Sequence, residues 1–335
     1  MRNLLVTGGA GFIGSNFVHY MLDRHDYRVV VYDKLTYAGR QENLAPVRHS
    51  PRFAFVQGDI ADAQAVRAAI REHRIDTIVN FAAETHVDRS ILDPDAFVKT
   101  DVYGAYVLCE AAKELGLERL HHISTDEVYG PIPTGVFNET DPFRPTSPYA
   151  ASKAGGELLV LSYHITYGLP ITITRGVNTY GPYQYPEKAM PLWITNAIDD
   201  QPLPLYGDGR QVRDRLFVTD HARAIDVVLH QGTLGQAYNV AADCERFNVD
   251  VAYMIVRALG KPDSLVQPVK DRAAHDVRYA LDTAKLRALG WQPQVSFEQG
   301  FEETISWYVD NQDWWRPIKT GEYLDYYRKQ YVDRG

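Results

Sequence analysis

The sequence predicts an α/β protein, with a doubly wound parallel sheet followed by a smaller lobe. Short apolar segments typical of buried strands alternate with helical segments over the first 174 residues. This alternation favours a parallel sheet covered by helices on both faces. A glycine-rich turn separates the first strand from the first helix, and beyond Tyr180 the alternation stops where prolines become frequent.

The elements follow one another in a regular order. Buried strands are expected at residues 2–7, 28–32, 53–56, 77–81, 119–124 and 170–174. Helices are expected from Phe12 through Met21 and at residues 62–73, 95–115 and 148–167. Because parallel crossovers are almost always right-handed, few other topologies are open to this order.

Two lobes are expected. Residues 1–180, with a later return of roughly 215–242, form the sheet domain, and residues 181–214 and 243–335 form the smaller lobe. Five prolines between 182 and 204, followed by Gly207-Asp208-Gly209, are typical of loops and short helices. We expect the tail from Asp313 to Tyr331, rich in Trp and Tyr, to pack against the body of the protein.

The composition excludes several functions. The 335 residues carry a formal net charge of −8, which argues against nucleic-acid binding. We expect no membrane partner, because no apolar run approaches the length of a membrane span. The two cysteines, Cys109 and Cys244, have no CxxC spacing, so we expect thiols in the cytoplasm.

The glycine-rich turn predicts a dinucleotide site. Gly8, Gly11 and Gly14 lie between strand and helix, where glycines let backbone N–H groups approach a diphosphate. Asp33 ends the next strand about 20 residues on, where an acid binds ribose hydroxyls. Its carboxylate would repel a 2′-phosphate, which favours NAD over NADP, although the neighbouring Lys34 weakens this preference. The turn and Asp33 together predict a Rossmann-like, NAD-binding domain.

A tyrosine and a lysine have the spacing of an acid–base pair. Tyr149 and Lys153 lie on one face of the expected helix, and Ser147-Pro148 favours a helix start. A tyrosine acting as a base near pH 7 needs its pKa lowered by about 3 units. Lys153, the helix dipole and a nicotinamide positive charge all act in that direction. After a dinucleotide motif, the pair predicts a dehydrogenase site.

Two adjacent acids add a second function. Ser124-Thr125-Asp126-Glu127 follows the strand at 119–124, at the edge where open parallel sheets bind ligands. Asp126 and Glu127 share one pocket only if the strand has given way to a turn, which Gly130-Pro131 favours. The alternative is a polar loop that caps the next segment. Beside Tyr149, an added acid and base can remove water, and we expect no metal ion.

Taken together, these segments resemble the dTDP-glucose 4,6-dehydratases, a group of the extended short-chain dehydrogenase/reductases. The similarity runs nearly end to end and includes TGGAGFIGSNF, YDKLTYAG, FAAETHVDRSI, STDEVYG, SPYAASKA, NTYGPYQYPEKAMP, DGRQVRD, HDVRYALD and LGWQP. The resemblance implies NAD as cofactor and a nucleotide-activated glucose, first of all dTDP-glucose, as substrate. It also implies a homodimer paired through a four-helix bundle, with the helices at 95–115 and 148–167 as candidates.

The resemblance further implies a sequence of steps. Thr125 and Tyr149 hold the glucose 4-hydroxyl, and Tyr149, tuned by Lys153, takes its proton while the C4 hydride passes to NAD. Glu127 then removes the C5 proton, and Asp126 protonates the departing C6 hydroxyl. The hydride returns to C6, giving a 4-keto-6-deoxy sugar, so NAD is regenerated in every turnover and need not leave.

Other positions are implied by the same likeness. The cofactor-binding residues would be Gly8, Gly11, Phe12, Ile13, Gly14, Asp33, Lys34, Thr36, Asp59, Ile60, Ala82, Ala83, Thr100, Tyr149, Lys153 and Asn178. The substrate-binding residues would be Thr85, Thr125, Asn178, Glu187, Lys188, Tyr206, Arg213, Asn248, Arg272, His275 and Tyr279. Arg213 is expected to clamp the diphosphate, since a guanidinium fork suits phosphate oxygens.

Three departures from the family pattern leave the nucleotide open. Arg215 stands where the family usually has an aromatic residue, and Ala241-Ala242 and Ala273-Ala274 stand where it usually has glycines or Pro-Gly. A UDP-glucose dehydratase therefore stays an alternative. Epimerases and decarboxylases of UDP-sugars share the Tyr-Lys pair but do not need Asp126 and Glu127. A catalytically silent NAD-binding regulator is the alternative outside enzymes.

Overall fold

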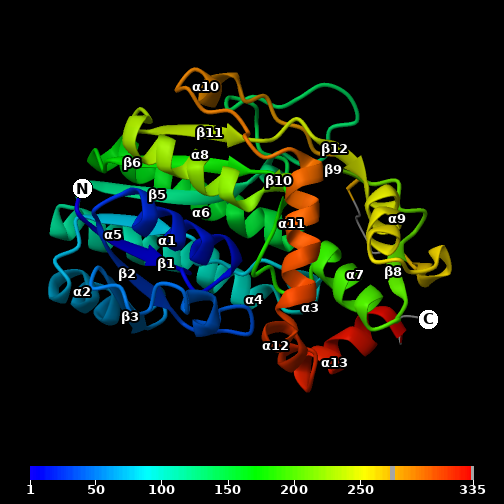
Figure 1. Cartoon of the computed structure of the whole chain (residues 1–335). Helices are drawn as coiled ribbons and strands as arrows, with labels where there is room; N and C mark the ends of the chain where they lie inside the picture. The colour runs from blue at the N-terminus through cyan, green and yellow to red at the C-terminus, as the bar shows by residue number, and fades with distance from the viewer. Residues whose placement is uncertain (272–275, 333–335) are drawn as a thin grey trace.

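The computed structural model of the chain describes residues 1–271 and 276–332. Its centre is a seven-stranded sheet with the order β11-β6-β5-β4-β1-β2-β3 (Figure 1), in which every neighbouring pair is parallel. The predicted α/β fold class is confirmed. The strands are β1 (Asn3–Thr7), β2 (Arg28–Asp33), β3 (Phe53–Gln57), β4 (Thr77–Asn80), β5 (Arg119–Thr125), β6 (Ile171–Gly176) and β11 (Gln236–Val240).

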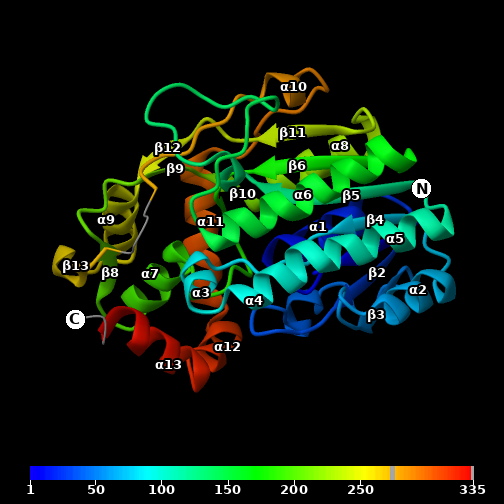
Figure 2. The same cartoon turned by 180° about the vertical axis from the view of Figure 1, so that it is seen from behind.

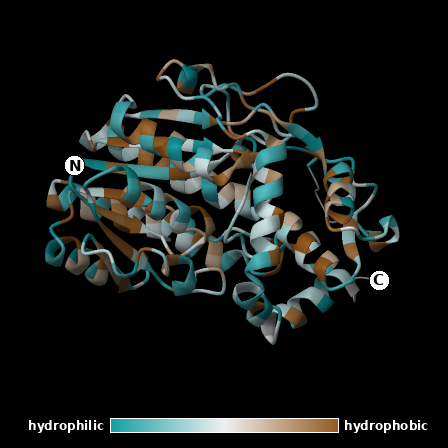
Figure 3. Ribbon diagram, in the orientation of Figure 1, coloured by the Kyte–Doolittle hydropathy of each residue, from teal (hydrophilic) through white to brown (hydrophobic). Residues whose placement is uncertain are grey.

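Helices cover both faces of this sheet. Figure 1 shows α1 (Phe12–Arg24) and α8 (Val218–Gln231) on one face. Figure 2 shows α2 (Ala63–Glu72), α5 (Ala105–Leu115) and α6 (Pro148–Tyr167) on the other. Two apolar cores fill the layers between sheet and helices, and hydrophobic residues gather there while the loops are mostly hydrophilic (Figure 3). Burial on both faces explains the continuous apolar runs of the strands.

The predicted helix over residues 95–115 is interrupted. The structure has α4 (Pro94–Phe97), a π-helical turn η2 (Val98–Gly104) and then α5. The widened turn carries the buried Asp101, whose carboxylate accepts hydrogen bonds from Ser152 Oγ (2.6 Å) and Glu84 N (3.0 Å). These two contacts join η2 to α6 and to the loop after β4. They connect residues distant in the chain, so the periodicity of the sequence could not predict the interruption of the helix.

The helix predicted over residues 148–167 is confirmed with the same limits. Ser147 Oγ accepts a hydrogen bond from Ala150 N (3.1 Å), and Pro148 occupies the first turn. Helix α2 is one residue shorter at each end than predicted, with Asp62 as its cap. Strand β4 ends at Asn80, one residue early, whereas β6 extends to Gly176 because Gly176 pairs with Thr125 of β5.

A third apolar core lies beside the sheet and includes residues between Tyr180 and Tyr331. Trp315 is fully buried in it and Tyr323 nearly so, which confirms the predicted packing of the tail. The larger elements around this core are α7 (Ala189–Ile198), β8 (Leu203–Tyr206), β9 (Val212–Asp214), β12 (Glu245–Phe247), α9 (Asn248–Ala258), β13 (Val266–Val269), α11 (Phe297–Asp310), α12 (Gln312–Trp315) and α13 (Glu322–Tyr327).

Shorter elements connect these parts. They are η1 (Gln41–Leu44), α3 (Val87–Leu92), η3 (Asp126–Tyr129), β7 (Thr179–Tyr180), β10 (Leu216–Phe217), η4 (Asp263–Leu265), α10 (Ala284–Arg287), η5 (Arg316–Ile318) and η6 (Arg328–Val332). None of the helices in the described part of the chain is long and apolar enough to cross a membrane.

Two adjacent glycines of α6 predict opposite responses to alanine. A Cβ at Gly156 would lie 2.2 Å from the backbone oxygen of Asp101, whereas a Cβ at Gly155 would lie 3.2 Å from its nearest neighbour, a methyl of Val102. We expect Gly156→Ala to lower the free energy of unfolding by about 1–3 kcal/mol. Gly155→Ala is the matched control and should be neutral or stabilising, since alanine favours helix by about 1 kcal/mol. Equal losses in denaturant unfolding would contradict the close approach of α6 and η2.

Candidate active site

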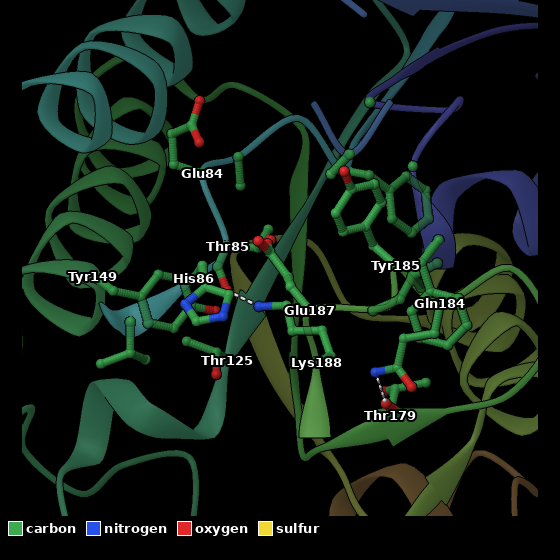
Figure 4. A pocket seen from close by; sticks show the side chains of 18 of the residues that line it. Glu84, Thr85, His86, Thr125, Tyr149, Thr179, Gln184, Tyr185, Glu187 and Lys188 are labelled. Carbon is green, nitrogen blue, oxygen red and sulfur yellow. Dashed lines mark hydrogen bonds between the residues drawn. The ribbon is translucent and has the colours of Figure 1, made fainter. Parts of the chain in front are cut away.

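A cavity of about 430 Å³ opens at the carboxyl ends of the central strands. Its walls come from the loops after β1, β2, β4, β5 and β6, and from β8, β9 and α9 of the second lobe. Figure 4 shows Thr125 and Tyr149 on one side of the cavity and Gln184, Tyr185 and Lys188 on another. Ligands of open parallel sheets bind at this edge.

The glycine-rich turn forms one end of the cavity. Gly8 has a positive φ of 67°, and a Cβ there would lie 2.5 Å from the backbone nitrogen of Ala82. A Cβ at Gly14 would lie 2.4 Å from the oxygen of Gly8. The turn therefore tolerates no side chain at these positions, and it leaves the N-terminus of α1 accessible from the cavity. This cradle fits a dinucleotide diphosphate.

Asp33 is placed to bind ribose hydroxyls. Its Oδ2 accepts a hydrogen bond from Ala10 N (2.9 Å) and its Oδ1 one from Leu35 N (2.8 Å), so the carboxylate is fixed while each oxygen keeps acceptor capacity. Burial raises the pKa of Asp33, and the two backbone bonds oppose the rise. Lys34 Nζ pairs with Asp59 Oδ2 at 2.7 Å. The lysine charge is therefore directed to Asp59, and Asp33 retains its preference for NAD over NADP.

The predicted Tyr-Lys pair lies at the centre of the cavity wall. Lys153 Nζ donates to the carbonyl of Ile123 at 2.8 Å, and burial lowers the lysine pKa. The pKa of the Tyr149 phenol lies well above its ordinary value, because the phenol is buried and faces the carboxylates of Glu127 and Asp101. This direction is opposite to the lowering expected from the sequence. Ionisation of Tyr149 therefore depends on further positive charge in the site.

The adjacent acids lie in the same cavity, as the sequence predicted for a strand that gives way to a turn. β5 ends at Thr125 and the 3₁₀ turn η3 begins at Asp126. Thr125 Oγ1 accepts from Glu127 N (3.3 Å) and donates to Asp126 Oδ1 (3.1 Å). Burial, together with the neighbouring Glu127 carboxylate, raises the pKa of Asp126 to about 8. At neutral pH the site thus holds a protonated acid directly beside Glu127.

The predicted cofactor residues all line this cavity, and so do most of the predicted substrate residues. The latter are Thr85, Thr125, Asn178, Glu187, Lys188, Tyr206, Arg213 and Asn248. Tyr279 does not line the cavity. It lies behind Arg213, with its ring 4.9 Å from the Arg213 guanidinium and its hydroxyl donating to Asp276. Arg272 and His275, like Ala273-Ala274, lie outside the described residues.

Two of these predicted substrate residues have partners within the protein. Glu187 Oε2 accepts from Arg89 Nη2 at 2.9 Å, and the Arg89 guanidinium lies 3.9 Å from the ring centre of Tyr37 and 4.5 Å from that of Tyr326. We call Arg89, Glu187, Tyr37 and Tyr326 the arginine clasp. Lys188 Nζ donates to the carbonyl of Thr85 (Figure 4), and burial lowers the Lys188 pKa.

The cavity also has lining residues that the sequence did not single out. Glu84 and His86 come from the loop after β4, Asp88 from α3, and Tyr331 from the tail. The Tyr206 hydroxyl donates to Asp88 Oδ2 at 3.2 Å, and the rings of Tyr206 and Tyr331 lie 5.7 Å apart. The segment FAAETHVDRSI, noted for its family likeness, held the signal for the first three. The sequence around Tyr331 contains no signal that predicts its place in the cavity wall.

One group among the described residues has the composition of a metal site. His25 follows the end of α1, Asp226 and His230 lie on α8, and none of the three lines the cavity. Both histidines lie 2.9 Å from Asp226 Oδ1, and His230 Nε2 lies 2.9 Å from the Tyr27 hydroxyl. The hydrogen-bonding atoms of this group therefore have protein partners.

Comparisons with known sequences agree with this geometry. A sequence profile described as GDP-mannose 4,6 dehydratase matches residues 5–304. The dTDP-glucose 4,6-dehydratase of Streptomyces niveus is 49% identical over 323 residues, covering 95% of this chain and 96% of that relative. The dTDP-glucose 4,6-dehydratase 1 of Escherichia coli K12 is 44% identical over 361 residues, covering 99% of each.

Solved structures give the same result. The dTDP-glucose 4,6-dehydratase DesIV of Streptomyces venezuelae, crystallised with NAD bound, has a TM-score of 0.92 and 48% identity, covering 95% of this chain and 100% of that one. A UDP-glucose 4-epimerase of Thermus thermophilus in complex with NAD has a TM-score of 0.86 and 34% identity, covering 92% and 100%. The resemblance found in the sequence is confirmed: the chain belongs to the family of the dTDP-glucose 4,6-dehydratases.

Proposed function

We propose that this enzyme converts dTDP-glucose to its 4-keto-6-deoxy derivative by oxidation at C4, loss of water across C5 and C6, and reduction at C6. The observation that carries this function is the convergence of Asp126, Glu127 and Tyr149 in one cavity behind a dinucleotide cradle. A dehydrogenase that only oxidises needs the tyrosine, whereas water loss next to a ketone needs an acid and a base.

Oxidation at C4 rests on Tyr149 and Thr125. Once ionised, the Tyr149 phenolate takes the proton of the 4-hydroxyl, and Thr125, which contacts both Tyr149 and Asp126, holds the same oxygen. NAD bound in the cradle would supply a hydride acceptor for C4, a hydride donor for C6 and a positively charged ring, and Glu127 would return its proton to C5. The buried phenol needs such a charge to ionise, because burial and the carboxylates of Glu127 and Asp101 raise its pKa.

Water loss rests on the two acids. The 4-keto group acidifies the C5 proton, which Glu127 removes, and the electron pair forms the C5–C6 double bond as the C6 oxygen leaves. Asp126 supplies the proton that converts this oxygen into water. The raised pKa of Asp126 supports this division of roles, since its proton is retained at neutral pH.

The nucleotide lies toward the second lobe in this proposal. Arg213 is fixed by the backbone carbonyls of Val212 (2.7 Å) and Asp276 (2.9 Å), which suits it to hold a diphosphate. Residues 181–214 and 243–335 would form the substrate-binding lobe, and residues 1–180 with 215–242 the NAD-binding domain. The parallel pairing of β11 with β6 supports the return of the chain to that domain.

We also propose a homodimer paired through η2, α5 and α6. These helices lie side by side on one face of the sheet (Figure 2), and they expose Val98, Tyr103, Leu158, Ile165 and Tyr167. Exposed large apolar side chains on neighbouring helices support an interface at this face. The cytoplasm is the proposed compartment, which the free thiols of Cys109 and Cys244 support.

Turnover of purified protein with dTDP-glucose tests the function directly. Formation of a 4-keto product without net accumulation of reduced nicotinamide is the expected result. UDP-glucose serves as the comparison substrate and should react more slowly. A product from UDP-glucose alone would reassign the nucleotide, and no product from either would contradict the proposed activity.

Replacing Glu127 should separate oxidation from dehydration. Glu127→Gln keeps the size of the side chain but removes the base, so reduced nicotinamide should accumulate with dTDP-glucose. The dehydration rate should fall about 10²–10⁴-fold. Glu302→Gln, an exposed change on α11 outside the cavity, is the matched control. Normal dehydration by Glu127→Gln would remove Glu127 from this role.

The Asp126 proton predicts a fall of rate at alkaline pH. The acid form is the proton donor and its pKa is raised to about 8, so single-turnover dehydration should be level below pH 8. Above that pH the rate should fall about tenfold per unit as the proton is lost. Asp126→Asn should be slow throughout and lack this alkaline limb. If the rate of Asp126→Asn falls at the same alkaline pH as that of the wild-type enzyme, the group that loses its proton is not Asp126.

A further inference from the structure

Arg215 is a second guanidinium in the wall of the cavity. It follows β9 directly, lies two residues beyond Arg213, and has a side chain that is largely buried yet lines the cavity. Its Nη2 donates to Asn248 Oδ1 at 2.6 Å. Its Nε is buried and has no hydrogen-bond partner among the described residues.

Among the described residues, no carboxylate forms an ion pair with Arg215, although the charge of Asp214 acts on it from a distance. A guanidinium has five N–H donors, and burying one without a counter-charge is costly. The nearest acid in sequence, Asp214, already accepts from the backbone nitrogens of Cys244 and Asp243, both at 3.0 Å. The neighbouring Arg213 is a further cation and opposes the charge of Arg215. A neutral aromatic ring at this position would carry no such cost.

The surroundings of Arg215 favour an anionic ligand. Asn248 is the first residue of α9, an eleven-residue helix, and both Asn248 and Arg215 line the cavity. The N-terminus of a helix favours negative charge. The bond to Arg215 occupies the Asn248 side-chain oxygen, so the amide N–H groups of Asn248 are its donors available for a ligand. The backbone N–H groups of Asn248 and Val249 already donate to the carbonyls of Gln211 (3.1 Å) and Gly209 (3.0 Å), so the helix contributes its dipole alone. Two arginines and a side-chain amide donor lie along this part of the cavity wall.

We infer that Arg215 binds an oxygen of the substrate's diphosphate, opposite or beside the oxygen held by Arg213, and that it fixes the orientation of Asn248. This inference rests on the proposed function, in which a nucleoside diphosphate sugar occupies the cavity. The terminal nitrogens Nη1 and Nη2, which are not among the buried atoms without a partner, form the two-pronged donor that matches phosphate oxygens. A thymine or uracil ring is neutral and would leave the second guanidinium without a counter-charge.

The test compares ligands that differ in phosphate. Thymidine, dTMP and dTDP are titrated calorimetrically into the NAD-loaded enzyme and into Arg215→Met, which keeps the length of the side chain without its charge. We expect the dissociation constant of dTDP to rise about 10–100-fold in the variant. The constant for thymidine should change less than about twofold. For dTDP-glucose, KM should rise while kcat is largely retained.

Two further variants control this comparison. Arg210→Met removes an exposed arginine from the neighbouring loop and should leave all three constants unchanged. Arg215→Lys keeps the charge but loses the planar fork, and it should bind dTDP more tightly than Arg215→Met. Equal weakening of thymidine and dTDP in Arg215→Met, or no weakening of dTDP, would overturn the assignment.

These measurements distinguish an error in the role of Arg215 from an error in the proposed function. If wild-type enzyme binds dTDP but Arg215→Met binds it equally well, the role of Arg215 is wrong and the proposed function stands. If wild-type enzyme binds UDP in place of dTDP, and Arg215→Met weakens UDP but not uridine, the role of Arg215 stands and the proposed nucleotide is wrong.

Discussion

The site depends on one contact between a helix and a strand, the bond from Lys153 Nζ to the carbonyl of Ile123. It draws the first turns of α6 onto the carboxyl end of β5, where the chain turns into η3. Tyr149 lies one helical turn before Lys153, so the same contact places the phenol beside Thr125. The absence of a side chain at Gly156 allows the approach from the other side, against the backbone of Asp101. Without this packing, the carboxyl groups of Asp126 and Glu127 and the phenol of Tyr149 would not lie in the same cavity.

Burial then determines the chemistry of these groups. Desolvation raises the pKa values of Asp126 and Tyr149, because each loses water and faces the carboxylate of Glu127. Two adjacent carboxyl groups in a dry pocket do not both ionise readily, so one keeps its proton as the other loses it. In the proposed mechanism, the neighbouring residues Asp126 and Glu127 therefore serve as the acid and the base. The same desolvation leaves the phenol neutral until a positive charge enters the site.

The sequence revealed those features that depend on neighbours along the chain. The glycine turn, Asp33, the helix over 148–167 and the turn after Thr125 follow from local spacing and caps, and the structure has each of them. The π-turn at 98–104 did not follow, because it depends on bonds from Asp101 to Ser152 and Glu84. The pairing of Glu187 with Arg89 and the place of Tyr331 also depend on residues far away in the chain. Burial and the carboxylates of Glu127 and Asp101, which raise the Tyr149 pKa, could not be read from periodicity. The expected lowering includes the nicotinamide charge and stays a prediction.

The arginine clasp has a consequence for how long the cofactor stays. Tyr37 belongs to the loop after β2, whose residues 33–39 form the dinucleotide side of the cavity, and Tyr326 belongs to the tail. Moving this loop outward would separate the Arg89 guanidinium from the Tyr37 ring, and this contact opposes opening of that side of the cavity. A redox carrier that is reduced and reoxidised within a single catalytic cycle needs no exchange with the cellular pool. In the proposed mechanism, a loop that stays closed between the two hydride transfers would keep the reduced intermediate in the cavity.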